Sequence, residues 1–462
     1  MKKYKFVYQL FIISFVLFLI GCNDQWDGYF DNKNSTNSLM ELIDNEPTLS
    51  KFAEYIKISG YDKNLSSAVD FSVWAPNNTE IDDIDLNDTA YISTYVGFFI
   101  TIGNYEGITG QQKLKMMDGK YITIDFDNKT IENASFDKPQ VAQNGHLYLL
   151  SGKLAPKNNI WELFNQNAST LKQKDYILSL NGYVFDEQNS RPIGVDEETG
   201  LTIYDSVKIF TNKLFIEQGD ISSEEKEYTY IVLSDNALDQ TVALYSSYFI
   251  PADTNSLYDL AIYHTCFDLL VEGEIDESQL PANLVSTSGI SFTLTSDIIT
   301  TQVEGSNGIL YYVNANPIKE KEKFTDIIIE GEDVALATNL AWKIRDAEGA
   351  SGGQELYFEG AVATDWVQYN TVIPFPVKID VYWTAVSDSS YNEQVGIYPL
   401  NAGDKTDAII KFPSSVTLDS YLQKNILGSY TFTEAGEVSF RLIGEGGNPL
   451  TLDRLILTPT NQ

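Results

Sequence analysis

The run Phe71-Ser72-Val73-Trp74-Ala75-Pro76-Asn77-Asn78 is apolar and is closed by proline and asparagine. This pattern predicts a short buried strand that ends at a turn. A related run, Tyr230–Asn236, follows about 160 residues later, and the same interval separates Gly145–Leu150 from Gly308–Val313. Two pairs of similar segments separated by the same interval indicate a duplicated domain.

Helical patterns accompany these strands. Apolar residues at 49, 52, 53 and 56 recur at helical spacing after Pro47 and before Gly60, which predicts an amphipathic helix. The segment 120–125 alternates as a strand. Leu39–Ile43 opens the first copy and Ile160–Phe164 opens the second. The first copy is therefore expected to have an α+β fold, and the second to repeat it.

The character of the chain changes after the charged run Lys319–Lys323, which we predict to be a solvated linker. From Phe324 onward the sequence is rich in glycine and in alternating strands, without a clear helix. The predicted fold class is thus multidomain, α+β and all-β. The predicted parts are a signal peptide at 1–21, a tether at 22–37, α+β domains at 38–158 and 159–318, and an all-β domain at 324–462.

Length, composition and charge limit the range of functions. The 462 residues suffice for roughly three domains, and 13% aromatic residues favour a folded chain. The formal net charge of -34 repels phosphate backbones, which excludes nucleic acid as a partner. With two histidines and two cysteines, the chain lacks the ligands for His/Cys zinc sites or a disulfide framework.

The N-terminus combines three lysines with an apolar run that ends in Leu19-Ile20-Gly21-Cys22. This ending resembles a bacterial lipobox, which implies cleavage before Cys22 and a lipid on its thiol. The alternative is an uncleaved N-terminal anchor. The resemblance predicts a protein anchored by lipid in the outer membrane of a Gram-negative bacterium. Asp24 and Asp27 resemble surface-export signals and favour the outward face.

The duplicated half resembles fasciclin domains, whose pattern is a strand ending in Phe-Ala-Pro-Thr-Asn, a central Tyr-His and a closing Gly-hydrophobic strand. The first copy matches at 73–78, whereas the second has Leu-Ser-Asp-Asn at 233–236 but supplies Tyr263-His264. In animal fasciclin proteins the Tyr-His motif is linked to cell adhesion. We interpret His264 as a packing residue. Cys266 is interpreted as a buried thiol, because side chains at i and i+2 of a helix do not face each other.

The last domain resembles the galactose-binding jelly roll of family 6 carbohydrate-binding modules. The matching segments are 329–333, 349–353, 365–369, 436–442 and 452–459. The resemblance implies a β-sandwich jelly roll and a structural calcium ion held by Glu330, Glu332 and Asp453, with backbone carbonyls supplying the remaining ligands. The alternative for these acids is an ordinary position at the ends of strands.

A glycan site needs exposed aromatic rings beside polar groups, because sugar rings stack by their apolar faces and their hydroxyls need partners. In the last domain such residues are Tyr357, Trp366, Trp383, Tyr391 and Asn448. The strand contexts of Trp366 and Trp383 also suit core residues. The binding tyrosine that the family has before its Asp-Trp pair has no clear counterpart in Gly360-Ala361-Val362.

We predict that the chain is not an enzyme, because no acidic residue is singled out by a recognisable loop, no phosphate loop is present, and neither resemblance implies hydrolysis. The preferred hypothesis is an outer-membrane lipoprotein that binds polysaccharide or oligosaccharide as an accessory of a polysaccharide-uptake system, beside outer-membrane glycan-uptake proteins. One alternative is adhesion or scaffolding through protein contacts of the fasciclin-like domains, with the jelly roll as a spacer. The other is glycoside hydrolysis by two of the 65 acidic residues.

Overall fold

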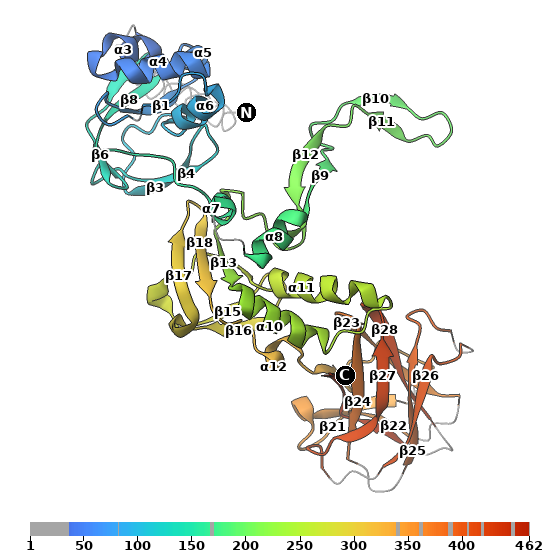
Figure 1. The fold of residues 1–462 in the computed structure, drawn as a ribbon. Coiled ribbons are helices and arrows are strands. Elements are labelled where there is room, and N and C mark those ends of the chain that lie inside the picture. Colours follow the sequence, from blue (N-terminus) through green and yellow to red (C-terminus); the bar gives the residue numbers. More distant parts are fainter. Residues whose placement is uncertain are drawn as a thin grey trace, which may run out of the picture. The chain divides into compact units, whose positions relative to one another are not determined.

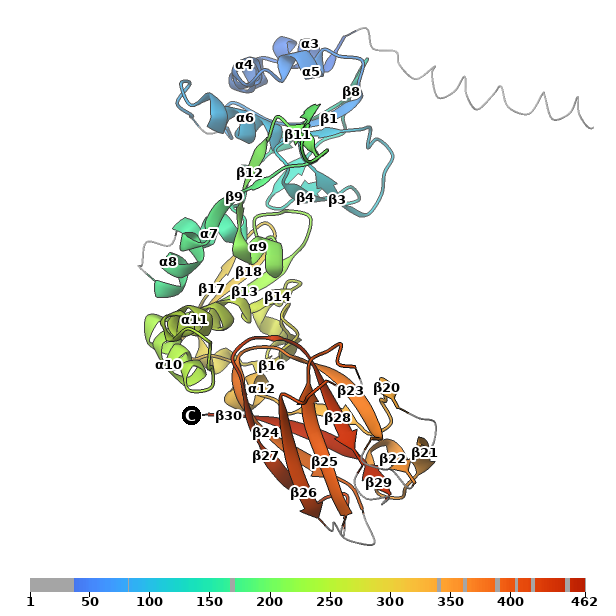
Figure 2. The same cartoon turned by 90° about the vertical axis from the view of Figure 1, so that its right-hand side faces the viewer.

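The computed structural model describes residues 37–81, 83–166, 171–338, 342–359, 364–386, 391–403, 406–416, 420–444 and 449–461. The predicted signal peptide and Cys22 lie outside these residues, as does the tether apart from Asn37. The described chain divides into two compact units (Figures 1 and 2). Unit 1 contains the residues up to Asn159 with 223–226 and 305–307, and unit 2 contains 160–222, 227–304 and 308–462.

Unit 1 is an α+β fold. Its helices are α3 (Leu39–Asn45), α4 (Ser50–Ser59), α5 (Asp62–Leu65) and α6 (Thr89–Gly97), with a 3-10 turn at Pro47–Leu49. Its strands are β1 (Phe71–Pro76), β2 (Ile100–Ile102), β3 (Gln111–Lys115), β4 (Tyr121–Asp125), β5 (Thr130–Ile131), β6 (Ala134–Phe136), β7 (Gln140–Ala142) and β8 (Gly145–Ser151). Ser38 and Glu41 form a capping box at the start of α3, and α4 buries the predicted apolar face. The sheet order is β2-β1-β8-β6-β5-β4-β3, with β7 paired to β8.

The first part of unit 2 repeats the central strand pairing of unit 1. Its helices are α7 (Ile160–Gln166), α8 (Lys172–Ser179), α9 (Lys213–Glu217), α10 (Asp235–Ser246) and α11 (Leu257–Phe267). Its sheet joins β14 (Leu270–Glu272), β13 (Tyr228–Leu233), β18 (Gly308–Val313) and β17 (Ile299–Glu304), and β15 (Ala282–Val285) pairs with β16 (Ser291–Leu294). β13 runs parallel to β18 and antiparallel to β14, as β1 does with β8 and β2. The predicted duplication is confirmed at the level of strand pairing.

A glycine begins the parallel partner strand in both copies. Gly145 pairs with Phe71 and Gly308 pairs with Tyr228. Their φ angles are 140° and 138°. A Cβ atom would lie 1.9 Å from the Phe71 carbonyl oxygen at Gly145 and 1.8 Å from that of Tyr228 at Gly308. Only glycine fits at these positions, because a side chain would collide with the neighbouring backbone.

The charged run 319–323 is only in part the solvated linker that we predicted, because residues 319–321 are exposed but Lys323 is not. Residues Glu320–Lys323 form the short helix α12, and Lys323 is buried. Its Nζ lies 2.6 Å from Asp268 Oδ2, in a pair whose side chains are 4% and 3% exposed. A lysine is seldom buried unless it is paired, and this partner is 55 residues distant in the sequence. The charge pattern alone therefore gave the wrong exposure for Lys323.

The second part of unit 2 is a β-sandwich, as predicted. One sheet has the order β20-β23-β28-β25-β26 and is called here the β23 sheet; the other has the order β19-β30-β24-β27 and is called the β24 sheet. A smaller sheet joins β21, β22 and β29. The strands are β19 (Ile327–Glu330), β20 (Leu336–Ala337), β21 (Trp342–Asp346), β22 (Gln354–Phe358), β23 (Trp366–Ile373), β24 (Val377–Thr384), β25 (Tyr391–Tyr398), β26 (Ile410–Val416), β27 (Asn425–Phe432), β28 (Gly436–Ile443), β29 (Leu450–Leu452) and β30 (Arg454–Thr460).

The sandwich and the preceding α+β part share one hydrophobic core. Phe249, Phe324 and Phe375 contact one another edge to face, with ring centroids 5.7, 5.2 and 5.5 Å apart. The Ile250 N–H donates to the Pro376 carbonyl at 3.1 Å. The two parts therefore pack as a single body, which explains why they fall into one compact unit.

A β-ribbon, residues 181–212, leaves unit 2 between α8 and α9; it is called here the arm. β9 (Asn181–Phe185) pairs with β12 (Lys208–Asn212) at its base, and β10 (Pro192–Val195) pairs with β11 (Thr202–Tyr204) near its tip. Figure 1 shows the arm extending away from the helices of unit 2. Most of its residues are exposed.

Candidate functional site

The β23 sheet carries a hollow of about 870 Å³ on the face turned away from the shared core; it is called here the sheet hollow. Strand alternation creates it: Val367 and Tyr369 belong to the core, so Trp366 points to the opposite face. Trp366, Tyr398 and Ile443 form a small apolar cluster there, separate from the main core. The lining is Leu336, Ala337, Thr338, Thr364, Asp365, Trp366, Tyr398, Thr406, Asp407, Ala408, Lys411, Arg441 and Ile443.

Arg441 fixes the floor of the sheet hollow. Its guanidinium carbon lies 3.8 Å from the ring centre of Trp366 and 4.6 Å from that of Tyr398. Its Nε donates to Gln368 Oε1 at 2.9 Å, and its terminal nitrogens donate to the carbonyls of Gly403 and Ala402. Because its planar group is engaged in this way, Arg441 holds the two rings and the 402–403 backbone in place.

Polar groups surround this apolar floor. Thr364, Thr406, Asp407 and Lys411 are exposed at the rim. Burial raises the pKa of Tyr398, the nearby Arg441 lowers it, and Asp407 raises it. The phenol therefore stays neutral at physiological pH and keeps its O–H as a hydrogen-bond donor.

Trp366 has an indole N–H that no described residue accepts. Its Nε1 is buried without a hydrogen-bond partner, although its backbone N–H donates to Thr338 Oγ1 at 2.9 Å. A buried donor without an acceptor costs about 1–3 kcal/mol.

The other predicted glycan residues do not gather around Trp366. Trp383 lies in the shared core on β24, so we exclude it from the site; Trp366 and Tyr398 are also largely buried, at 7% and 6% exposed, but they belong to the separate cluster that lines the sheet hollow. Tyr357 lies on β22, with the guanidinium carbon of Arg345 at 4.1 Å from its ring centre. Tyr391 begins β25, but its side chain lies outside the described part, and so do Asn448 and the stretch 360–362.

The three predicted calcium ligands lie close to Ser351 and Gly352. Asp453 is fully buried; its Oδ1 accepts the Ser351 N–H at 2.7 Å and its Oδ2 accepts the Thr384 hydroxyl at 2.9 Å. Glu330 Oε1 accepts the Ser351 hydroxyl at 3.1 Å. The remaining Oε2 atoms of Glu330 and Glu332 are buried, and no described residue donates to them. Such oxygens have the donor chemistry that calcium prefers.

The electrostatics of these acids also favours a bound cation. Burial raises the pKa of Glu330, the Ser351 hydroxyl lowers it, and Glu332 raises it. A cation would relieve that repulsion. However, among the described residues no three His, Cys, Asp or Glu side chains are grouped closely enough to hold a metal ion. An ion here would need backbone carbonyls or water beside the glutamates.

His264 and Cys266 are packing residues of α11, as we interpreted them. His264 lies between the rings of Phe249 and Phe375, with centroids 5.1 and 5.7 Å away, and the Lys323 ammonium lies 3.2 Å from its Nδ1. Burial and the Lys323 charge lower the pKa of His264 to about 3, so its ring stays neutral. Cys266 is fully buried and unoxidised, and burial raises its pKa. Neither group can act as a nucleophile here.

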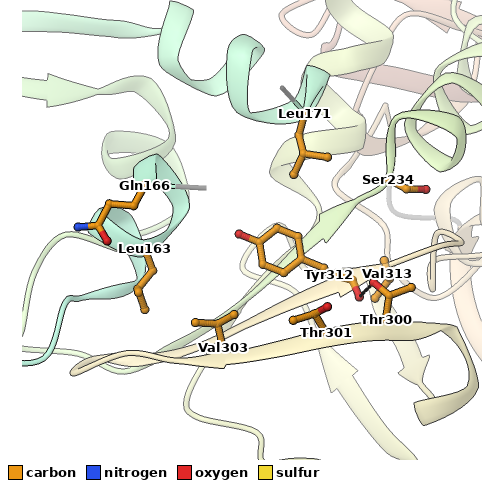
Figure 3. Close-up of a pocket in the computed structure, with 9 residues that line it drawn as sticks. All are labelled: Leu163, Gln166, Leu171, Ser234, Thr300, Thr301, Val303, Tyr312 and Val313. Atoms are coloured by element: carbon orange, nitrogen blue, oxygen red, sulfur yellow. Dashed lines mark hydrogen bonds between the residues drawn. The ribbon is translucent and has the colours of Figure 1, made fainter. Parts of the chain in front are cut away.

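A second hollow, of about 580 Å³, lies between α7 and the strands β17 and β18 (Figure 3). Leu163, Tyr312 and Val303 give it an apolar wall, and the Thr300 hydroxyl donates to the Tyr312 carbonyl at 2.9 Å. Residues 167–170, between α7 and Leu171 of its lining, lie outside the described part. We therefore assign no ligand to it.

Sequence reasoning found Trp366 but missed Tyr398, Asp407, Lys411 and Arg441. These four come from β25, β26 and β28 and their loops, and only the strand order brings them to Trp366. One signal was present in the sequence: Arg441 stands between apolar residues in the alternating run 438–442, where a charged residue on a buried strand needs partners.

The fold is thus that of a multidomain α+β and all-β protein, with a polar-rimmed hollow on its β-sandwich. No protein-family model and no curated protein matches the chain. Solved structures similar to parts of it include a Podospora anserina GH26-CBM35 β-(1,4)-mannanase, 16% identical over 30% of this chain and 28% of that one, with a TM-score of 0.24. A Cellvibrio mixtus lichenase 5A carbohydrate-binding module in complex with cellotriose is 14% identical, covering 29% and 98%, with a TM-score of 0.23. A FAS1 domain pair from the insect cell adhesion molecule Fasciclin I is 14% identical, covering 60% and 98%, with a TM-score of 0.22.

Among the described residues, no helix is long and apolar enough to cross a membrane.

Proposed function

We propose that the chain is a non-catalytic binding protein and that the sheet hollow binds a glycan. The observation that carries this proposal is the hollow of about 870 Å³ on the β23 sheet, which lies over the apolar cluster of Trp366, Tyr398 and Ile443 and has a polar rim. The floor is apolar, and the rim offers hydroxyls, a carboxylate and an ammonium group. A sugar presents an apolar ring face and hydroxyls that both donate and accept, which matches this distribution.

The cellular setting in this proposal is an outer membrane. Cleavage before Cys22 and lipidation of its thiol would hold the chain at the outer membrane of a Gram-negative bacterium, facing the exterior. What supports this is the sequence alone: three lysines, an apolar run and Leu19-Ile20-Gly21-Cys22. There the protein would hold polysaccharide or oligosaccharide for outer-membrane glycan-uptake proteins.

We also propose a structural calcium ion at Glu330 and Glu332. Their buried Oε2 atoms support it, since both lack a described donor. The ion would neutralise two like charges and tie the end of β19 to the 351–352 turn. Asp453 would contribute mainly by holding Ser351, because both of its oxygens already accept hydrogen bonds.

Affinity electrophoresis of the full chain against plant, host and microbial polysaccharides tests the glycan proposal. The site variant is Asp407→Ala with Lys411→Ala at the rim; the control is Lys378→Ala with Asp380→Ala on β24. A hydrogen bond to a charged group contributes about 1.5–3 kcal/mol, so the site variant should lose about tenfold or more in affinity. The control should be retained as well as the unaltered chain. Equal retention of both variants, or no retention of the unaltered chain by any polysaccharide, would refute the proposal.

A further inference from the structure

The arm is an addition to the repeated fold. In unit 1 the chain passes from the end of α4 at Ser59 to the start of α5 at Asp62. At the corresponding place in unit 2 it passes from Ser179 at the end of α8 to Lys213 at the start of α9. The arm fills this longer connection, and unit 1 pairs its central strands in the same way without one. The arm is therefore not required by the fold.

Both faces of the arm carry apolar side chains. The register pairs Tyr183 with Phe210, whose rings meet edge to face at 5.8 Å. Directly opposite residues of an antiparallel pair point to the same face, so these two rings share one face. Val184 and Ile209 are paired next to them and point to the other face. No core lies on either side of this ribbon in the described structure, since all four side chains are exposed.

Exposed apolar side chains are concentrated in the arm. Of the 25 large hydrophobic side chains exposed in the described chain, ten belong to it: Tyr183, Val184, Phe185, Ile193, Val195, Leu201, Ile203, Val207, Ile209 and Phe210. Single exposed hydrophobic residues are ordinary, but a concentration of this kind marks an interaction surface.

The arm is held in shape by its own turns. Asp196 Oδ1 accepts the Glu198 and Thr199 N–H groups at 3.0 and 2.8 Å, which closes the tip. At the bend, Asp186 Oδ1 accepts the Gln188 N–H at 3.1 Å, and Ser190 Oγ accepts the Val207 N–H at 2.9 Å. A ribbon with fixed turns loses less conformational entropy when a partner covers it.

The charges of the arm indicate the chemistry of its partner. Six acidic residues, at 186, 187, 196, 197, 198 and 205, accompany two basic ones, at 191 and 208. We propose that the arm docks into another protein, whose surface offers an apolar groove that contacts both faces of the ribbon and a rim of lysine and arginine side chains. This surface is distinct from the sheet hollow and does not depend on glycan binding.

Charge and chemistry select this occupant over three others. A second copy would bring together two acidic arms on chains of formal net charge -34 each. An anionic lipid surface is repelled for the same reason. A glycan stacks on aromatic rings, whereas Ile193, Val195, Leu201 and Ile203 at the tip are aliphatic.

Site-specific photo-crosslinking in cells that make the full chain tests the proposal. Benzoylphenylalanine is placed at Tyr183 on one face and at Ile209 on the other, with Leu422, an exposed residue of the sandwich, as the control. The expected result is one and the same protein attached at both arm positions and not at Leu422. The purified partner should then bind the full chain at least tenfold more weakly after Tyr183→Ser with Phe210→Ser. Glu197→Gln with Glu198→Gln, at the exposed tip, should weaken binding severalfold and reduce its salt dependence.

Four outcomes would overturn the proposal. These are a crosslinked product of twice the chain mass, a product with lipid or polysaccharide, no product at either arm position, and binding of the purified partner that neither double variant changes. Circular dichroism of both variants checks that they fold, and the Glu197/Glu198 variant changes charge without removing an apolar contact. Retention of a polysaccharide by the same variants should be unaffected, so failure here is distinguishable from failure of the glycan proposal.

Discussion

Removing the Lys323 charge should destabilise unit 2 far more than its place in a charged run suggests. Lys323 Nζ lies 2.6 Å from Asp268 Oδ2, and both side chains are almost fully buried. Asp268 also accepts the Ser288 hydroxyl at 2.9 Å. Burial pushes the pKa of Lys323 down and that of Asp268 up, and the ion pair opposes both shifts. The Lys323→Met variant would leave the Asp268 carboxylate buried with no cation beside it.

The magnitude follows from this burial. Breaking one side of a buried pair costs about 3–5 kcal/mol, whereas replacing both partners by apolar residues is often neutral or stabilising by about 1–4 kcal/mol. We therefore expect Lys323→Met to lower the free energy of unfolding of unit 2 by about 3–5 kcal/mol. Adding Asp268→Leu should restore most of that loss. The control, Lys321→Met at an exposed position of α12, should stay within about 0.5 kcal/mol of the unaltered chain.

Hydrogen exchange of the full chain, read by mass spectrometry in peptides from β13 and β24, measures this effect within unit 2. Because the α+β part and the sandwich share a core, protection should fall in both peptides together. A loss below about 1 kcal/mol for Lys323→Met, or a double variant no more stable than the single one, would refute the reasoning.

Three further perturbations have defined outcomes. The His264→Leu variant tests the pH dependence of stability. The pKa of His264 is lowered to about 3 in the folded chain, so the unaltered chain should lose stability as the pH falls below about 6.5, by up to about 1.4 kcal/mol per pH unit. In thermal melts over that pH range the variant should lose less. The Gly308→Ala variant should lower the free energy of unfolding by about 3 kcal/mol, because its Cβ would meet the Tyr228 carbonyl, whereas Gly194→Ala, with open space around it, should change little in urea titrations. The pKa of Glu330 is raised in the folded chain, so in the presence of chelator the melting temperature should fall as the pH rises from the ordinary glutamate pKa through the raised one, because ionisation costs more in the folded state. Added calcium, or the Glu330→Gln variant, should remove this fall. A fall that persists in calcium would count against the ion.

Much of the fold could be predicted because its signals are local. The helical spacing at 49–56 predicted α4, and the apolar runs 71–76 and 308–313 predicted β1 and β18. The duplication could be predicted because the same interval separates two pairs of similar segments, and these segments form the strands whose pairing is repeated. The change of composition after Lys323 predicted the β-sandwich. Each of these inferences depends on residues that are neighbours in the chain.

The rest depended on contacts between distant residues. The sequence predicts a solvated Lys323 because its partner, Asp268, lies at the end of a different helix, α11. Trp366 and Trp383 look alike in their strands, yet one lines the sheet hollow and the other lies in the core, because alternation fixes opposite faces only once the register is known. The sequence of the arm does not differ from that of ordinary short strands. Only the described structure shows that no other layer of unit 2 covers it.

The indole N–H signals of Trp366 and Trp383 offer the most direct test of the central claim. Both Nε1 atoms are buried without a described acceptor, so the second ring is a control within the same chain. Nitrogen-15 tryptophan labelling of the full chain, with assignment through Trp366→Phe, gives a separate signal for each. On addition of an oligosaccharide of the retained polysaccharide, the account predicts that the Trp366 signal moves and the Trp383 signal does not. Binding that leaves Trp366 unmoved would contradict it.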